Sequence, residues 1–245
     1  INFLPPYRGE TIIELSTLLG ISINDVQKRA SERLIKSVIK IKEVKSEEEI
    51  KEIEKAVDTA YEMHTTSMRM AIPGRIEQEI VGKIEGISLA SGGPVSFPII
   101  LTQDGQTLHN HHHDNILEVG RMMVTDAGSE TQECYSSDIT RTVPVGGKFN
   151  KRQSEIYQIV LDANLAAIHA VKPGTKFKNI HFIAAKVIIE GLIKVGLMKG
   201  NSKKALKAEA HTLFMPHGLG HMMGMDVHDM EGLGENYVGY DEKTH

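Results

Sequence analysis

Residues 122–142 read MMVTDAGSETQECYSSDITRT, and this stretch decides which fold the chain is expected to adopt. Apolar and β-branched residues at both ends predict two strands, and small and polar residues between them predict a connection. Asp126 closes the first strand and Asp138 opens the second. If the strands pair as an antiparallel hairpin, both carboxylates lie at one end of the sheet, where they repel each other unless a proton or a cation neutralises them. Taken singly, either aspartate is better explained as a turn or strand-end cap.

Residues 217–229 read HGLGHMMGMDVHD and carry a second chemical signal. The segment contains three histidines, namely His217, His221 and His228. The glycines between them favour a loop and strand over a helix, and they allow the backbone to approach a site closely. Carboxylate oxygens and imidazole nitrogens are ligands of divalent metals, so Asp126, Asp138 and His221 together predict a metal site.

A further histidine-rich stretch, residues 109–114, reads HNHHHD. Its composition is that of a segment that binds metal adventitiously, and its internal position excludes an expression tag. We expect one functional histidine in this tract and surface positions for the others. The histidines elsewhere in the chain are expected to be surface or satisfied core side chains: His64, His169, His181, His211 and His245.

Composition bounds the class of protein. With 245 residues, 40% hydrophobic and 24% charged, the chain is expected to be a soluble globular protein of one large domain, or one domain and a fragment. A net charge of −4 excludes the basic footprint of a nucleic-acid or anionic-membrane partner. No apolar run approaches the ~20 residues that span a bilayer. Cys134 is the only cysteine, which excludes an internal disulfide and favours a reducing, cytoplasmic location.

Apolar residues at helical spacing predict a helix from Asp25 to about Lys40. Ser46 and Glu49 then match a capping box, so a second helix is predicted to begin at Ser46. The main domain is expected to start with this second helix.

The expected organisation is therefore a remnant of an N-terminal domain with a linker helix over residues 1–45, and the main domain over residues 46–245. The chain begins with Ile1 rather than Met, and it ends at His245, soon after the last histidine motif. We therefore expect it to be an internal piece of a longer protein.

An internal echo relates two parts of the main domain. AIPGR at residues 71–75 recurs as VKPGT at residues 171–175, each between two helical patterns. The shared order of helix, Pro-Gly and helix indicates a duplicated half-domain, with chance similarity of two helical hairpins as the alternative. Strands are predicted at Pro98–Thr102, Thr107–Asn110, Met122–Asp126 and Asp138–Val145. Helices and strands are segregated rather than strictly alternating, so the predicted class is α+β.

At these motifs the sequence resembles the pita-bread metallopeptidases: aminopeptidase P (Xaa-Pro aminopeptidase), prolidase and methionine aminopeptidase. The resemblance extends from about residue 46 to the end and is closest to aminopeptidase P and prolidase. It implies the pita-bread (creatinase/aminopeptidase-like) fold, in which pseudo-two-fold duplicated helices surround an antiparallel sheet, here incomplete at the C-terminus. It also implies that residues 1–45 are the end of an extra N-terminal domain.

The resemblance implies a role for each matching residue. Asp126 resembles the bidentate ligand of one metal ion, Asp138 the bridging ligand, and His221 a ligand of the other ion. His228 resembles the histidine that contacts the substrate near the scissile bond. The histidines that line the substrate pocket in this family are matched by His217 and His109.

The family's two remaining ligands are glutamates that follow the last histidine motif. Glu231, Glu235 and Glu242 lack the expected surroundings, so we do not assign them. With three ligands of five, this chain alone is expected to be inactive, with an empty or partly occupied metal site. The spacing from Asp126 to Asp138 is one residue longer than the family pattern, which predicts a small bulge or a longer hairpin.

The expected function is that of a dinuclear-metal exopeptidase that removes the N-terminal residue from peptides with proline in second position. A ligand set rich in carboxylates suits Mn²⁺, with Zn²⁺, Co²⁺ and Fe²⁺ as alternatives. We expect a homodimer without nucleic-acid or membrane partners.

The alternative functions are an Xaa-Pro dipeptidase (prolidase), a non-catalytic pita-bread module that binds peptides or proteins, and a creatinase-like hydrolase without metals. Retention of Asp126, Asp138 and His221 favours the metalloenzyme over the last two.

Overall fold

The computed structural model describes residues 1–239, which form two compact units. One unit combines residues 1–143 with the chain from Met222 onward, and the other spans Pro144–His221. These units do not test the domain boundary expected between residues 45 and 46, which stays a prediction. In the described part of the chain, no helix combines the length and the apolar character needed to cross a membrane.

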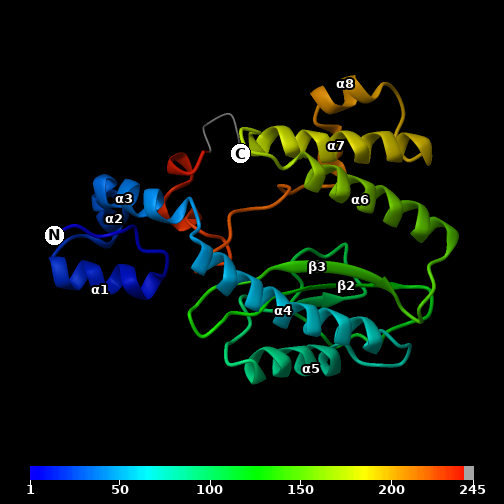
Figure 1. The fold of residues 1–245 in the computed structure, drawn as a ribbon, viewed down its shortest axis with the longest axis horizontal. Helices are drawn as coiled ribbons and strands as arrows, with labels where there is room; N and C mark the ends of the chain where they lie inside the picture. Colours follow the sequence, from blue (N-terminus) through cyan, green and yellow to red (C-terminus); the bar gives the residue numbers. More distant parts are fainter. Residues whose placement is uncertain (240–245) are drawn as a thin grey trace. The chain divides into compact units, whose positions relative to one another are not determined.

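The first unit opens with short helices (Figure 1). They are α1 (Gly9–Leu19), α2 (Ile23–Val26), the 3₁₀ helix η1 (Gln27–Arg29) and α3 (Glu32–Lys42). The single helix expected from Asp25 to Lys40 is therefore wrong, because the backbone leaves the helical region at Ala30. Ser31 then starts α3 as its N-cap, with its hydroxyl accepting a hydrogen bond from Leu34 N at 3.3 Å. Serine competes with a continuing helix because its side chain can satisfy the first amides of a new one.

The main helical hairpin of this unit is α4 (Glu47–Met70) and α5 (Glu77–Ala90). The predicted capping box at Ser46 is confirmed: Ser46 N donates to Glu49 Oε2 at 2.7 Å, and Glu49 N donates to Ser46 Oγ at 3.3 Å. The two helices are joined through Pro73-Gly74, where Gly74 has a φ of 86° that favours glycine. The buried stripe of α4 consists of Ala56, Ala60, Met63, His64 and Ser67.

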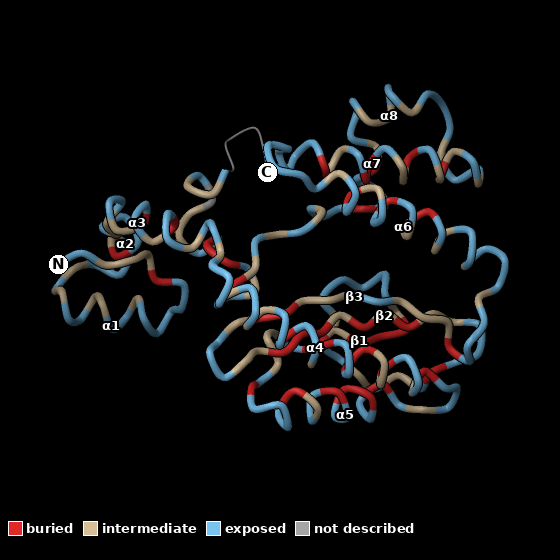
Figure 2. The backbone as a smooth tube through the Cα atoms, viewed as in Figure 1, coloured by how far each residue is buried: buried red, intermediate tan, exposed pale blue. Residues whose placement is uncertain are grey.

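A three-stranded sheet lies beside this hairpin, in the order β1 (Ile100–Thr102), β2 (Met122–Ala127) and β3 (Ile139–Pro144). β1 and β2 are antiparallel, with Ile100 opposite Asp126. Buried residues lie within β1 and α5, and along β2 buried and half-buried residues alternate (Figure 2). The strand expected at Thr107–Asn110 is wrong, because Thr107 N closes a turn on Asp104 O at 2.8 Å and His109 has a φ of 53°.

The second unit consists of α6 (Lys151–Ala170), α7 (Phe177–Lys194), α8 (Ser202–Lys207) and the 3₁₀ helix η2 (Ala210–Leu213). α6 begins with its own capping box, formed by Asn150 and Gln153. Its core is made of small and branched residues from α6 and α7, namely Ala163, Ala167, Ile180 and Ala184. The order of helix, Pro-Gly turn and helix is thus present in both units, as the sequence predicts.

After the second unit the chain returns to the first. Two short 3₁₀ helices follow there, η3 (Glu231–Leu233) and η4 (Glu235–Tyr237).

Candidate metal centre

The two aspartates of the opening motif meet at one end of the β2–β3 hairpin. Asp126 is the penultimate residue of β2, and Asp138 immediately precedes β3. Their carboxyl groups share a hydrogen bond, and Thr140 Oγ1 donates to Asp126 Oδ1 at 2.8 Å. Two carboxyl groups can approach so closely only if a proton or a cation offsets their repulsion.

The pKa of Asp126 differs from that of an ordinary aspartate. Burial is the largest cause and raises the pKa to about 6, and the charge and hydrogen bond of Asp138 raise it as well. The hydroxyl of Thr140 and the charge of His109 act in the opposite direction. Asp126 therefore binds a proton more readily than an ordinary carboxylate does. Asp126 and Asp138, called the acid pair below, carry oxygen donors of the kind that divalent cations bind.

Close packing of the hairpin connection holds the acid pair together. Ser137 N donates to Ser129 O at 2.9 Å, and Ser137 Oγ donates to Ala56 O of α4 at 2.9 Å. A Cβ atom on Gly128 would lie 1.7 Å from Ser137 O, so only glycine permits this approach. The connection between the aspartates is thus held on both sides, by Ser129 and by α4.

His64 of α4 supports β2 from behind, and sequence reasoning did not assign it to the site. It is buried, and its Nε2 lies 3.1 Å from Ala127 O, the carbonyl next to Asp126. Burial lowers the pKa of His64, which keeps the ring neutral. The expectation of a core side chain is met, and its place in the buried stripe of α4 was a usable signal.

The histidines of residues 109–113 have different surroundings. His109 lies close enough to Asp126 for its charge to lower the pKa of that carboxyl. His113 Nδ1 lies 3.0 Å from Leu101 O and ties the tract to β1, while His111 and His112 are exposed. The charge of His109 therefore acts on Asp126, and the assignment of His109 to the substrate pocket stays a prediction.

His217 and His221 belong to the second unit, whose position relative to the first unit is not determined. The joining of His221 to the acid pair therefore stays a prediction. Among residues 1–239 no three or more His, Cys, Asp and Glu side chains are gathered as a complete metal site, and the assignment of the acid pair as metal ligands stays a prediction. Within the second unit, the rings of His181 and His211 lie 5.5 Å apart, and burial, followed by the charges of His211 and His217, lowers the pKa of His181.

Of the other histidines given no role from sequence, His211 is buried, His181 is half-buried and His169 is exposed. Glu242 and His245 lie outside the described residues.

His228 belongs to the first unit. Its ring is exposed, and Nδ1 lies 2.8 Å from Glu231 Oε2, so a glutamate that the sequence left unassigned orients it. Asp229, the next residue, is fully buried.

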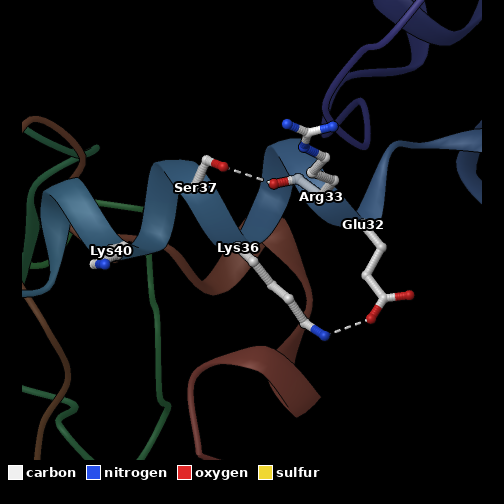
Figure 3. Close-up of a pocket in the computed structure, with 5 residues that line it drawn as sticks. All are labelled: Glu32, Arg33, Lys36, Ser37 and Lys40. Atoms are coloured by element: carbon white, nitrogen blue, oxygen red, sulfur yellow. Dashed lines mark hydrogen bonds and ion pairs between the residues drawn. The ribbon is translucent and has the colours of Figure 1, made fainter.

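A hollow of about 510 Å³ lies along α3 (Figure 3). Its lining residues all come from this one helix: Glu32, Arg33, Lys36, Ser37 and Lys40. Lys36 Nζ pairs with Glu32 Oε1 at 2.5 Å across the helix surface. None of the residues predicted for the metal site lines this hollow.

Comparison with known proteins identifies the family. The model of metallopeptidase family M24 matches residues 51–244, which is most of the chain. The chain belongs to metallopeptidase family M24. A metallopeptidase requires side chains that bind divalent metal ions.

Relatives within family M24 are named for one activity. The chain is 35% identical over 215 residues to a probable Xaa-Pro aminopeptidase of Tuber melanosporum, covering 86% of this chain and 47% of that protein. It is 42% identical over 139 residues to a probable Xaa-Pro aminopeptidase of Phaeosphaeria nodorum, covering 57% of this chain and 30% of that protein. The chain thus spans less than half the length of these relatives.

Solved structures confirm the pita-bread fold. A variant of Escherichia coli aminopeptidase P in complex with substrate superposes with a TM-score of 0.75 at 33% identity, covering 77% of this chain and 43% of that one. Proline aminopeptidase P II from Yersinia pestis gives a TM-score of 0.74 at 33% identity, covering 77% and 44%.

Proposed function

We propose that the full-length protein is a metal-dependent aminopeptidase that removes the N-terminal residue from peptides with proline in second position. The single observation that carries this proposal is the acid pair, in which Asp126 and Asp138 share a hydrogen bond. The names of the family M24 relatives support the choice of substrate. Substrate and product complexes solved for E. coli aminopeptidase P support a peptide ligand.

The acid pair fits a divalent cation. Burial and the neighbouring Asp138 both raise the pKa of Asp126, and a bound cation would offset the repulsion between the two carboxylates as a proton does. Asp126, Asp138 and His221 are the proposed ligands of two metal ions. When bound, such ions polarise a scissile carbonyl and make water a nucleophile at neutral pH. Mn²⁺ is the proposed ion because the donors are mainly carboxylates, although a zinc-substituted E. coli relative has been solved.

The histidines are proposed to act on the peptide. With Nδ1 donating to Glu231 Oε2, the ring of His228 has a fixed orientation from which it can donate to a carbonyl oxygen that gains negative charge. His109, whose charge lowers the pKa of Asp126, is proposed, with His217, to line the substrate pocket.

Two properties of the whole protein belong to the same proposal, namely a cytoplasmic location and a homodimer. The single Cys134, exposed and without a disulfide partner, supports a reducing compartment. Light scattering on the full-length protein measures the oligomeric state directly.

The second candidate function is that of an Xaa-Pro dipeptidase, because the sequence also resembles prolidase and the acid pair does not distinguish the two. Full-length protein with added Mn²⁺ is assayed on Xaa-Pro dipeptides and on Xaa-Pro-Yaa tripeptides. Cleavage of the tripeptides at the Xaa-Pro bond supports the aminopeptidase, and cleavage of dipeptides alone supports the dipeptidase.

The matched variants test the metal reading. Asp138→Asn removes one charge of the acid pair and is expected to abolish turnover of both substrates. Asp58→Asn makes the same change at an exposed position of α4 and is expected to retain it. Undiminished turnover in Asp138→Asn contradicts the proposed role of the pair. A wild-type protein that binds Xaa-Pro peptides without cleaving them supports the non-catalytic module.

A further inference from the structure

Asp229, the residue after His228, is a buried carboxylate whose partners come from the opposite end of the described chain. Its side chain is 0% exposed. Lys42 Nζ lies 2.5 Å from Oδ1, and Lys45 Nζ lies 2.9 Å from Oδ2. An ionised carboxylate out of water is strongly unfavourable unless it is paired, so each lysine stabilises Asp229 in this position.

The two lysines are themselves held in place. Lys42 is the last residue of α3, and Lys45 stands just before α4. Lys45 Nζ also donates to Lys42 O at 2.6 Å, which closes the connection between the helices around the carboxylate. Burial acts to lower the pKa of Lys42, but hydrogen bonds and charges from Asp229 and Asp226 outweigh it and raise the pKa. Lys42 is therefore charged at neutral pH.

The segment that carries His228 is closed by its own backbone. Asp229 N donates to Met222 O at 3.0 Å, which pins both ends of the loop together. Gly224 O accepts a hydrogen bond from Ser136 N at 2.9 Å, so the loop is also tied to the connection that leads to Asp138. A Cβ atom on Gly224 would lie 2.5 Å from Asp229 Oδ2 and 3.0 Å from Lys45 Cε. The loop thus packs directly on the ion pairs.

Apolar packing fixes the chain just beyond Asp229. Met230 is buried with Ile35 and Ile39 of α3. The two residues after His228 are therefore both anchored. Asp229 is held by ion pairs with Lys42 and Lys45, and Met230 by apolar contacts with α3.

We propose that Asp229 is a positioning residue, whose buried carboxylate, clamped by Lys42 and Lys45, fixes the segment that presents His228 to the substrate. This inference rests on the proposed function, since it assigns His228 to the substrate. On this proposal, the α3–α4 connection influences the rate of peptide hydrolysis although it is far from the acid pair in sequence.

The test compares two lysines near each other in sequence. Lys45→Met removes one arm of the clamp, at a side chain that is 14% exposed. Lys36→Met makes the same change at a side chain that is 62% exposed, does not contact Asp229, and pairs with Glu32 on α3 (Figure 3). Its ammonium also lies 5.9 Å from the centre of the Tyr237 ring. Lys45→Arg retains the charge and serves as the rescue variant.

Two readouts are taken on the full-length protein. In Xaa-Pro peptide hydrolysis with Mn²⁺, Lys45→Met is expected to lower kcat by about tenfold or more, with a smaller change in KM, as for other groups that orient a reacting residue. In hydrogen–deuterium exchange, amides of residues 222–231 are expected to exchange about tenfold faster in Lys45→Met, because the loop opens more often. Lys36→Met is expected to match the wild type in both, and Lys45→Arg to recover most of the loss.

Each outcome has a meaning. Equal kcat in Lys45→Met and Lys36→Met, with the wild type active, overturns the positioning role whatever the exchange shows. If the wild type does not cleave Xaa-Pro peptides, the proposed function fails, and exchange alone judges the clamp: unchanged exchange overturns it, and faster exchange supports it. Should Lys45→Met fail to fold, Gly224→Ala provides a second route, because its methyl group displaces the same carboxylate while keeping all charges; wild-type kcat in that variant overturns the proposal.

Discussion

The hairpins α4–α5 and α6–α7 start from the same local signals and have different surroundings. Each begins with a capping box and turns at Pro-Gly. The stripe of α4 includes two buried polar residues that contact β2: His64 at Ala127 O, and Ser67 Oγ 2.7 Å from Thr125 Oγ1. The contact between α6 and α7 is made of alanine and isoleucine, and from Lys151 to His221 all described elements are helical.

This contrast shows what a polar residue in a buried stripe signifies. A hydroxyl or imidazole is buried at little cost only where a partner accepts its hydrogen bond. His64 and Ser67 therefore mark the face of α4 that meets strand backbone and a strand hydroxyl, and the apolar stripe of α6 marks a helix that meets another helix. The acid pair lies on the strands that α4 supports.

The largest expected effect tests whether both units contribute to one metal site. Asp126→Ala and His221→Ala are each expected to lower kcat/KM by more than about 100-fold, because losing a residue that binds the metal costs more than losing one that only orients a metal-binding residue. Both variants are also expected to retain less Mn²⁺ after dialysis, as measured by elemental analysis. If His221→Ala keeps full Mn²⁺ content and full activity, the second unit contributes no ligand to the metal site of the acid pair.

Next in size is the packing of the second hairpin. A Cβ atom on Gly191 of α7 would lie 2.6 Å from Ile159 side-chain atoms of α6, so Gly191→Ala is expected to destabilise the protein by about 1–3 kcal/mol. In the first hairpin, Gly86 of α5 has no atom within 4 Å of such a Cβ, so Gly86→Ala is expected to stabilise by about 0.5–1 kcal/mol. Urea unfolding measures the change in the free energy of unfolding for both variants. If Gly191→Ala stabilised the protein as Gly86→Ala does, the α6–α7 contact would have room for the added methyl group.

The stability of the metal-free protein is expected to depend on pH through Asp126 of β2. Burial and Asp138 raise the pKa of Asp126 from 3.8 to about 6, so the folded state binds this proton more tightly than the unfolded state does. The stabilisation is complete below pH 3.8 and is lost as pH rises through about 6.

Asp126→Asn keeps a neutral side chain at every pH. Relative to this variant, the wild type in EDTA is expected to lose about 1 kcal/mol between pH 4 and 7, after allowance for partial solvent exposure. Unfolding at several pH values measures this loss, and Asp162→Asn on exposed α6 serves as the control without such a trend. A constant difference between wild type and Asp126→Asn across that range would contradict the raised pKa.

The smallest expected effect is on stability, from removing the N-cap of the capping box that each hairpin has. Ser46→Ala and Asn150→Ala each remove an N-cap and are expected to cost about 1 kcal/mol. Thermal unfolding of both variants should show similar losses, since the two boxes have the same bonding pattern. A much larger loss at one position would mean that its cap is coupled to tertiary contacts.

Local signals explain where prediction from sequence succeeded. The Ser46–Glu49 box, the Pro-Gly turns and the strands around Asp126 and Asp138 depend on residues a few positions apart, so their chemistry is visible in one dimension. The same local reasoning failed at Asp25–Lys40, where a serine cap interrupts an apolar pattern, and at Thr107–Asn110, where a turn replaces a strand.

By itself, the sequence determined the family, the acid pair and the paired helical hairpins, because each rests on residue types at short and fixed spacing. Only the tertiary structure placed His64 behind β2 and set Lys45 on Asp229, across 184 positions of sequence. The physical reason is that burial of a charged or polar group is decided by its partner, and that partner is chosen when distant segments pack together.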